Sequence, residues 1–436
     1  MKDELLKRIE GRKCKVGVIG LGYVGLPLLI EFSKGGFPVL GFDTDSAKIE
    51  KLEKSESYIK HISADAISEA FKGDTGATTD FASVSGCDAI LICVPTPLTK
   101  DRDPDLSYIC QTAEQIGPHL RKGQLIVLES TTYPGTTEEV LVPILEKKSG
   151  LKAGEDFFVA FSPEREDPNN PQYSTSTIPK VVGGLTDDSL ETAQALYNSI
   201  ICETVPVSNC RAAEAAKLVE NIFRSINIAL VNELKMVFEK MDIDVWEVIN
   251  AASTKPFGYM PFYPGPGLGG HCIPIDPFYL AWKAAKCGIP TKFIKLAGEI
   301  NTHMPEYVIQ KTIAALGEQG KALKDSHVLL VGLAYKKNVD DDRESPAYML
   351  WENLSKQGAK VSYYDPYCPE IRPSRDHSDL AGIKSVSWQE VENGGFDVAI
   401  IVTAHDSVDH GKLVKALSLV VDTRGVCKPA ENVKKA

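Results

Sequence analysis

One stretch of the sequence carries a residue that could form a covalent bond with a substrate. It runs from Gly265 to Asp276, with four glycines ahead of Cys272 and an acid at its end. Glycines let a backbone pass close to a bulky ligand, and a cysteine thiolate held there can attack a carbonyl carbon. Cys272 is therefore a candidate nucleophile, with a buried structural cysteine as the alternative. His271 is left out of catalysis, because neighbouring side chains in an extended loop point to opposite faces.

A second motif, near the start of the chain, is typical of a dinucleotide site. Residues 15–19 read as a buried strand, and the glycine-rich turn Gly20 to Gly25 follows, before an apolar helix. The glycines would make the bend, admit the pyrophosphate to the helix N-terminus and let the helix pack on the strand. Asp43 ends the next predicted strand, where an acid can receive a ribose hydroxyl and favour NAD over NADP. The alternative is an ordinary strand-turn-helix without a nucleotide.

The composition indicates a large protein without nucleic-acid or membrane character. The chain has 436 residues, a net charge of −11 and ten cysteines. This length predicts two or three domains, each with its own core. The negative charge disfavours nucleic acid and anionic membranes as partners. Without a spanning segment or a signal-peptide core, a cytoplasmic protein is expected. The cysteines form no CxxC pair, so neither a metal site nor a disulfide framework is expected.

The strand pattern of the N-terminal third returns near the C-terminus. Three of its strands have counterparts there, at 327–332, 361–365 and 396–402. The sequence thus predicts two doubly wound, Rossmann-like α/β domains. Ala334 and Lys336 stand in the second copy's turn, and Lys336 adds a positive charge at a phosphate-binding position. We infer that this copy binds a different nucleotide, that of the substrate.

Helical periodicity dominates the segment between the two copies. Apolar residues recur at helical spacing from Ala212 to Val237, which indicates one long helix. A small middle domain cannot bury all of its apolar surface, which favours a homodimer, or a higher oligomer built from it. An intramolecular spine between the α/β domains is the alternative. The predicted domains are 1–208, a central helical domain at 209–316, and 317–436.

Seven separated motifs occur along the chain in an order that matches a known family. They are Gly20 to Gly25, Val94-Pro95-Thr96-Pro97, Glu129-Ser130-Thr131, Ser162-Pro163-Glu164, Lys217-Leu218-Val219-Glu220-Asn221, Gly269 to Asp276, and Gly332 to Ser345. With these motifs the chain resembles the UDP-glucose/GDP-mannose dehydrogenase family, the NAD-dependent nucleotide-sugar 6-dehydrogenases. The resemblance extends from Lys15 to about Val426. It implies NAD as the cofactor and a UDP-sugar as the substrate.

The resemblance implies oxidation of a primary alcohol to an acid, which needs two hydride transfers. Cys272 would add to the intermediate aldehyde, and the thiohemiacetal would become a thioester that water cleaves. Lys217 and Asn221, at i and i+4 of one helix, could place a cation and an amide donor at the negative oxygen. Without the resemblance, Lys217 would be interpreted as a solvated helix lysine.

Acid-base roles are also implied by the resemblance. Glu164 lies in the loop after a predicted strand at 157–161 and would help to activate the hydrolytic water. Thr131 and Asp276 would position the water and the lysine, although each alone could be a turn or capping residue.

The same resemblance implies two sets of ligand contacts. The cofactor contacts would be Gly20, Gly22, Tyr23, Val24, Gly25, Asp43, Pro95, Thr96, Ser130, Thr131 and Arg343. The substrate contacts would be Glu164, Arg165, Lys217, Asn221, Phe262, Tyr263, Gly267 and Lys336. The charged run around Arg343 would otherwise be a solvated loop. The resemblance instead implies that the guanidinium of Arg343 contacts a nucleotide phosphate, because its planar set of N–H donors matches phosphate oxygens.

One departure from the family pattern bears on the substrate. Many UDP-glucose dehydrogenases carry lysine immediately before the loop aspartate, where this chain has Ile275. The chain thus resembles the branch that oxidises UDP-N-acetylhexosamines for surface polysaccharides. We expect UDP-GlcNAc as the substrate, with UDP-ManNAc and UDP-glucose as alternatives.

Two other functions compete with this one. A one-step NAD-dependent hydroxyacid dehydrogenase would account for the chain up to Asn221 but leave the Cys272 loop and the C-terminal copy without a role. A non-catalytic NAD sensor would not need Lys217, Asn221, Cys272 and Asp276 together. The number of NADH molecules released per substrate molecule distinguishes the three functions. A nucleotide-sugar 6-dehydrogenase releases two, a hydroxyacid dehydrogenase releases one, and a sensor releases none.

Overall fold

The protein folds into two compact units. Its structure, a computed structural model, describes residues 1–59, 62–99, 101–165, 173, 175–270, 273–373 and 377–436. Unit 1 comprises residues 1–220 and 278–289, and unit 2 comprises residues 221–277 and 290–436. The division falls inside one helix, α8 (Cys210–Glu239), which confirms the predicted long helix. The three-way division at residues 208 and 316 remains a prediction.

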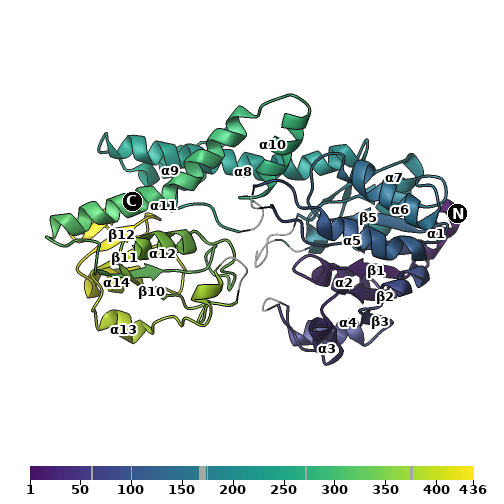
Figure 1. The fold of residues 1–436 in the computed structure, drawn as a ribbon, viewed down its shortest axis with the longest axis horizontal. Coiled ribbons are helices and arrows are strands. Elements are labelled where there is room, and N and C mark those ends of the chain that lie inside the picture. The colour runs from purple at the N-terminus through teal and green to yellow at the C-terminus, as the bar shows by residue number, and fades with distance from the viewer. Residues whose placement is uncertain (60–61, 100, 166–172, 174, 271–272, 374–376) are drawn as a thin grey trace. The chain divides into compact units, whose positions relative to one another are not determined.

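Unit 1 is built on an eight-stranded sheet with the order β3-β2-β1-β4-β5-β6-β7-β8 (Figure 1). The strands are short, mostly apolar runs that turn residues interrupt, as expected for strands buried on both faces. Strands β1 to β6 are parallel, and β7 pairs antiparallel with β6. Their bounds are β1 Val16–Ile19, β2 Val39–Phe42, β3 Thr75–Thr78, β4 Ala89–Ile92, β5 Leu125–Leu128, β6 Phe158–Phe161, β7 Lys180–Gly184 and β8 Thr204–Val207.

Helices cover both faces of this sheet. One core lies under α1, α2, α3, α4 and α7, and the other lies under α5, α6 and the first turn of α8. Apolar side chains at helical spacing bury these helix faces, and polar caps begin several of them, as where Asp45 accepts a hydrogen bond from Ala47. The helix bounds are α1 Lys2–Glu10, α2 Gly25–Lys34, α3 Ser46–Glu53, α4 Ala64–Phe71, α5 Ser107–Ile116, α6 Val142–Ser149 and α7 Asp187–Tyr197.

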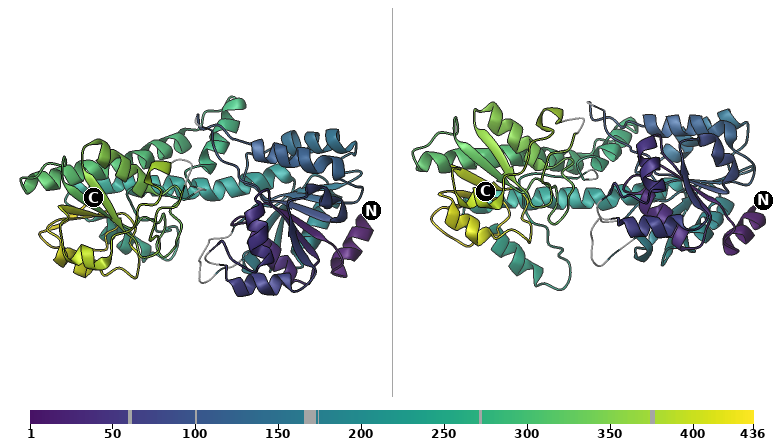
Figure 2. Two further views of the ribbon diagram at one scale, coloured as in Figure 1. Left: turned by 60° about the horizontal axis from the view of Figure 1, so that its bottom comes forward. Right: turned by 90° about the horizontal axis from the view of Figure 1, so that it is seen from below.

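Unit 2 contains a second, all-parallel sheet, whose strands are coloured green to yellow in Figure 2. Its strand order is β10-β9-β11-β12-β13. Helices α11 and α12 pack on one face, and α13 and α14 pack on the other. The strand bounds are β9 His327–Val331, β10 Lys360–Tyr364, β11 Val398–Ile401, β12 Val420–Asp422 and β13 Val433–Lys435. The helix bounds are α9 Val245–Ser253, α10 Asp276–Lys286, α11 Lys292–Glu318, α12 Pro346–Lys356, α13 Trp388–Glu392 and α14 His410–Ala416.

The predicted fold class is confirmed, with two Rossmann-like α/β sheets and a helical segment between them in the sequence. Predicted strands differ from the observed ones by one or two residues at their ends, as at β6, which begins at Phe158. Among the described residues, no helix is long and apolar enough to cross a membrane.

Candidate active site

The candidate residues of unit 1 gather at one edge of its sheet. The turn from Gly20 follows β1, Asp43 follows β2, and Glu164 lies just after β6. The segments at 94–96 and 129–131 follow β4 and β5. Because β1 to β6 run parallel, their carboxyl ends meet at this edge, the usual position of a ligand crevice in an open α/β sheet. These residues therefore follow the strands as the sequence pattern predicted, and their roles stay predictions.

The glycine-rich turn has the backbone that a pyrophosphate site needs. Gly20 has φ +89°, and a Cβ there would lie 2.6 Å from the carbonyl oxygen of Cys93. A Cβ at Gly25, the first residue of α2, would lie 1.9 Å from the carbonyl oxygen of Gly20. A Cβ at Gly22 would meet nothing within 4 Å. Two glycines therefore allow the helix to pack on the strand, while the middle one leaves open space before the helix N-terminus.

Asp43 lies beside this turn, with its carboxylate held in place. One oxygen accepts the backbone N–H of Leu21 at 3.0 Å and the ammonium of Lys48 at 2.9 Å. The other oxygen accepts the backbone N–H of Asp45 at 3.0 Å. A carboxylate has about four acceptor positions, so these three donors leave room for a ribose hydroxyl. Tyr23 and Val24 lie in the same turn, immediately before α2.

Hydrogen bonds link the loops after β4 and β5. The Thr96 hydroxyl donates to the carbonyl oxygen of Thr131 at 2.8 Å, and the Ser130 hydroxyl donates to that of Val94 at 2.7 Å. The Tyr279 hydroxyl also donates to the carbonyl oxygen of Thr96 at 2.8 Å. The hydroxyls of Thr96 and Ser130 thus fix these two loops to each other.

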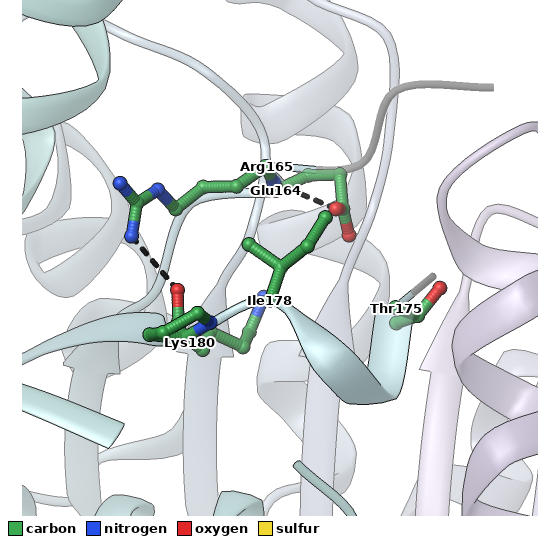
Figure 3. Close-up of a pocket in the computed structure, with 6 residues that line it drawn as sticks. Glu164, Arg165, Thr175, Ile178 and Lys180 are labelled. Carbon is green, nitrogen blue, oxygen red and sulfur yellow. Dashed lines mark hydrogen bonds between the residues drawn. The ribbon is translucent and has the colours of Figure 1, made fainter. Parts of the chain in front are cut away.

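Glu164 lines a pocket with Arg165, Thr175, Ile178, Pro179 and Lys180 (Figure 3). One carboxylate oxygen accepts the backbone N–H of Arg165 at 2.6 Å. The Arg165 guanidinium donates to the carbonyl oxygen of Pro179 at 2.8 Å and pairs with Glu220 of α8 at 2.7 Å. Glu164 and Arg165, both predicted to contact the substrate, therefore lie together in one pocket.

Lys217 is buried on α8, with 8% of its surface exposed. A solvated helix lysine would keep most of its ammonium in water. The burial therefore favours a functional or structural role for Lys217 over the solvated alternative.

A buried hydrogen bond in unit 2 joins Asn221 to Asp276. The Asn221 amide nitrogen donates to an Asp276 carboxylate oxygen at 2.5 Å, and both residues are buried. Asp276 is the first residue of α10 and follows the predicted nucleophile loop. An amide nitrogen carries two N–H donors, so this bond uses one of them. His271 and Cys272 lie outside the described residues.

The glycine-rich loop before Cys272 packs on the C-terminal nucleotide motif. A Cβ at Gly267, where φ is +142°, would lie 3.1 Å from the side chain of Pro346. Cβ atoms at Gly269 and Gly270 would lie 2.9 and 3.0 Å from the Tyr335 side chain. Unit 2 therefore brings together the loop and the segment at 332–346, which sequence reasoning assigned separately to catalysis and to substrate binding.

Four other predicted ligand contacts lie in unit 2. Phe262 packs against Phe223 of α8, with their ring centroids 5.7 Å apart. The exposed Tyr263 donates from its hydroxyl to Asn250 at 2.9 Å. The fork of Arg343 donates to both carboxylate oxygens of Asp341, at 2.8 and 2.6 Å. A nucleotide phosphate would have to compete with Asp341 for that fork. Lys336 is partly buried in the turn after β9.

Arg424 is a candidate site residue that sequence reasoning missed. A Cβ at Gly265 would lie 2.4 Å from its guanidinium, so the arginine lies directly against the glycine-rich loop. Its Nε donates to the carbonyl oxygen of Val402 at 2.7 Å. Arg424 follows β12 at the carboxyl edge of the second sheet, the position that could have marked it as a candidate. Among the residues that the structure describes, no cluster of three or more His, Cys, Asp or Glu side chains could hold a metal ion.

Known proteins resemble this chain over most of its length. It is 38% identical over 392 residues to the UDP-N-acetyl-D-glucosamine 6-dehydrogenase of Pseudomonas aeruginosa, which covers 90% of each chain. It is 33% identical over 424 residues to the UDP-N-acetyl-D-mannosamine dehydrogenase of Pyrococcus horikoshii, which covers 95% of this chain and 96% of the relative. The solved structure of a UDP-D-ManNAc dehydrogenase from Pyrococcus horikoshii matches with a TM-score of 0.86 at 32% identity, and covers 95% and 96% of the two chains.

Three family models match successive parts of the chain. They describe an NAD-binding domain at 14–201, a central domain at 211–303 and a UDP-binding domain at 329–429. The first confirms NAD as the predicted cofactor, and its range contains the glycine-rich turn and Asp43. The chain therefore belongs to the UDP-glucose/GDP-mannose dehydrogenase family.

Proposed function

We propose that the protein oxidises C6 of a UDP-N-acetylhexosamine to the carboxylic acid with NAD, and that UDP-GlcNAc is its preferred substrate. The observation that carries this proposal is the buried Asn221–Asp276 hydrogen bond. It ties the helix that carries the predicted oxyanion donors to the residue that ends the Cys272 loop. A single hydride transfer would not need a nucleophile loop fixed to this helix, whereas a covalent second oxidation would.

The unit 1 edge supports binding of NAD there. Gly22 leaves the space at the N-terminus of α2 into which a pyrophosphate fits, and Asp43 keeps an acceptor position for a ribose hydroxyl. The loops at 94–96 and 130–131 would flank the same cofactor. When bound, NAD supplies the hydride acceptor, and a four-electron oxidation needs two of them per sugar.

The chain's own residues would carry the covalent chemistry. The Cys272 thiolate adds to the aldehyde carbon, which forms a C–S bond and places a negative charge on the oxygen. Lys217 and the second N–H of Asn221 would stabilise that oxygen. Loss of hydride from the thiohemiacetal gives a thioester. Glu164 would then take a proton from water as it attacks, and the C–S bond breaks to return the thiolate.

Thr131 and Asp276 would act as positioning residues. Thr131 lies in the loop that is bonded to Thr96, beside the candidate cofactor edge. Asp276 holds the Asn221 amide and brings a negative charge to the helix that carries the buried Lys217.

Each unit by itself offers candidate contacts for the substrate. In unit 2, the Gly267 loop packs on the segment that contains Lys336 and Arg343, which supports a site for the UDP moiety there. Phe262, Tyr263 and Arg424 would complete this surface. In unit 1, Glu164 and Arg165 would face the sugar from their shared pocket.

The preference for an N-acetylhexosamine rests on Ile275 and on the relatives. Ile275 replaces the lysine that many UDP-glucose dehydrogenases carry before this aspartate, and the two relatives described above act on UDP-GlcNAc and UDP-ManNAc by name. UDP-ManNAc and UDP-glucose are the competing substrates.

A homodimer formed across α8 is part of the proposal. Phe223, Leu230 and Val237 are exposed on this helix. Their seven-residue spacing puts them on one face of it. An exposed apolar stripe of this kind is typical of a surface that pairs with another helix. Size-exclusion chromatography with light scattering would distinguish a dimer, or a larger assembly built from it, from a monomer.

The test of the activity is a substrate panel with a product count. UDP-GlcNAc, UDP-ManNAc, UDP-glucose and GDP-mannose are each incubated with NAD, and NADH is counted per sugar consumed. We expect the highest kcat/KM with UDP-GlcNAc and two NADH per sugar. Turnover dominated by UDP-glucose would refute the substrate assignment alone. One NADH per substrate would favour a two-electron dehydrogenase and refute the covalent mechanism.

A further inference from the structure

A buried ion pair lies next to the Glu164 pocket. Lys180, the first residue of β7, places its ammonium 2.6 Å from a carboxylate oxygen of Glu129, which follows β5. The exposed fractions of the two residues are 5% and 1%. The other Glu129 oxygen accepts a hydrogen bond from the hydroxyl of Tyr197 on α7. The carboxylate is therefore fixed from two sides.

Lys180 also holds the backbone that leads into Glu164. Its ammonium donates to the carbonyl oxygen of Pro163 at 3.2 Å, and it lines the same pocket as Glu164 (Figure 3). The hydroxyl of Ser162 donates to the carbonyl oxygen of Val181 at 2.8 Å. The two residues before Glu164 are thus tied to the first two residues of β7.

The energetics of such a pair favour a role beyond packing. Removing two charges from water is costly, and well-packed apolar residues in place of a buried ion pair are often neutral or stabilising. Burial acts to lower the pKa of Lys180, but the carboxylates of Glu129 and Glu164 outweigh it and raise the pKa. Lys180 therefore keeps its positive charge beside Glu164, in a place where an apolar side chain would serve the core equally well.

We propose that Lys180 is a positioning residue for Glu164. Its ammonium holds the Pro163 carbonyl and so sets the direction in which the Glu164 side chain leaves the backbone, while Glu129 and Tyr197 fix the ammonium. This inference rests on the proposed function, in which Glu164 activates the water that cleaves the thioester. A small displacement of that carboxylate would slow the hydrolytic step without weakening binding of the cofactor.

The main test replaces both charges together, so that neither is left buried alone. The double variant Lys180→Met with Glu129→Gln is compared with Lys180→Arg, which keeps the charge. Asp88→Asn is the matched control: Asp88 is also buried and ion-paired, but it precedes β4 at the opposite edge of the same sheet.

The readouts are kcat, KM for NAD, KM for the UDP-sugar and thermal unfolding. We expect the double variant to lose about 10²-fold in kcat, the loss typical of a reacting group displaced by about 1 Å. Both KM values should stay within about threefold of wild type, and Lys180→Arg should recover part of kcat. The Asp88→Asn control should lower the unfolding temperature and leave kcat unchanged. A rise in KM for NAD with a normal kcat would overturn the inference, because it would place the pair in cofactor binding through the adjacent Ser130.

A comparison in the Glu164→Gln background separates this inference from the proposed function. If Glu164→Gln alone turns over normally, the assigned role of Glu164 is wrong. If Glu164→Gln is slow but the Lys180/Glu129 variant keeps the wild-type kcat, only the positioning inference fails. If Lys180 acts through Glu164, the charge replacement should cause little further loss in the Glu164→Gln background. An equal loss in both backgrounds would overturn the inference.

A milder variant keeps the test decisive if the double variant does not fold. Tyr197→Phe removes only the hydroxyl that holds Glu129. We expect a loss of kcat of a few-fold, relative to Asp88→Asn, with thermal stability close to that control. A kcat equal to that of the control would overturn the inference.

Discussion

Replacing Asp43 by asparagine should reduce the preference for NAD over NADP. The carboxylate lies next to the candidate ribose position, where the 2′-phosphate of NADP would meet a like charge. Two unit charges 4 Å apart interact by about 4 kcal/mol at an effective dielectric constant of about 20. Lys48 lies 2.9 Å from the same carboxylate and cancels part of this repulsion. We therefore expect the ratio of kcat/KM for NAD to that for NADP to fall by about tenfold, equivalent to about 1.4 kcal/mol.

Asparagine is a better test than alanine, because Asp43 also supports the glycine-rich turn. Its carboxylate accepts the backbone N–H groups of Leu21 and Asp45 in addition to Lys48. Asparagine keeps one oxygen for Leu21, at a cost of about 1 kcal/mol of stability for the bond lost on the other side. Alanine would leave a buried N–H unsatisfied, at about 1–3 kcal/mol, and would confuse loss of the turn with loss of the charge.

The assay is steady-state kinetics with both cofactors, together with thermal unfolding of each variant. Asp45→Asn is the control, because Asp45 caps α3 two residues away and asparagine caps a helix equally well. It should leave the cofactor ratio unchanged. A folded Asp43→Asn enzyme with the wild-type ratio would refute the reasoning, and would show that another residue reads the ribose.

Three further predictions test the covalent step, the oxyanion site and a buried lysine. Cys272→Ala should abolish acid formation, and Glu164→Gln should accumulate a Cys272 thioester that intact-protein mass spectrometry detects; an alanine variant with near-normal turnover would exclude covalent catalysis at Cys272. Asn221→Ala should lower kcat by about 10²–10³-fold, as for an oxyanion donor, whereas a change in KM alone would place Asn221 in ground-state binding. Lys235 is buried, its ammonium has no hydrogen-bond partner among the described residues, and burial lowers its pKa to about 7 from an ordinary 10.5. Between these two pKa values the unfolded chain binds more protons than the folded one. The loss of stability caused by burying the charged Lys235 ammonium is therefore fully present below pH 7 and disappears as the pH rises toward 10.5. Lys235→Met should therefore raise the free energy of unfolding at pH 7 by an amount on the order of 2–4 kcal/mol, with little gain at pH 10; a gain independent of pH in denaturant titrations would contradict this account.

The positions of residues at strand ends could be predicted from the sequence. Short apolar runs mark the strands, a parallel sheet gathers their carboxyl ends, and so Gly20, Asp43 and Glu164 fall at one edge. The long helix α8 could also be predicted, since helical spacing is sustained across it. The local sequence pattern is therefore enough to predict which candidate site residues lie together when the strand order of the sheet alone brings them to the same edge.

Contacts between distant segments could not be predicted in this way. Asn221 and Asp276 are 55 positions apart, and no periodicity in the sequence predicts their hydrogen bond. Arg424 becomes a candidate only when Gly265 is seen to lie against its guanidinium. For Arg343 the sequence suggests a phosphate contact, but the structure shows a different partner. The carboxylate of Asp341, two residues before it, accepts hydrogen bonds from the Arg343 guanidinium. The burial of Lys180 and its hydrogen bond to the carbonyl oxygen of Pro163 also could not be predicted from the sequence.

The two α/β sheets show why similar strand patterns need not bind the same ligand. Each has an aspartate after its second strand, Asp43 after β2 and Asp365 after β10. Asp43 accepts three donors, which leaves one of about four acceptor positions for a ribose hydroxyl. The carboxylate of Asp365 lies within hydrogen-bond distance of five groups, the backbone N–H groups of Leu333, Ala334, Tyr367 and Cys368 and the ring of His405. It has no acceptor position left.

The turns after the first strand of each sheet share a glycine but differ in the helix that follows. Gly20 and Gly332 both have positive φ, at +89° and +93°, and both turns approach the neighbouring strand too closely for a side chain. Beyond that residue the copies differ: α2 begins at Gly25, directly after the first turn, whereas α12 begins only at Pro346. Residues 332–345 are all described, and no helix begins among them, so the second turn lacks a helix N-terminus that could receive a pyrophosphate. Together with the saturated Asp365, this explains how two sheets with similar strand patterns can match different models, an NAD-binding domain at 14–201 and a UDP-binding domain at 329–429.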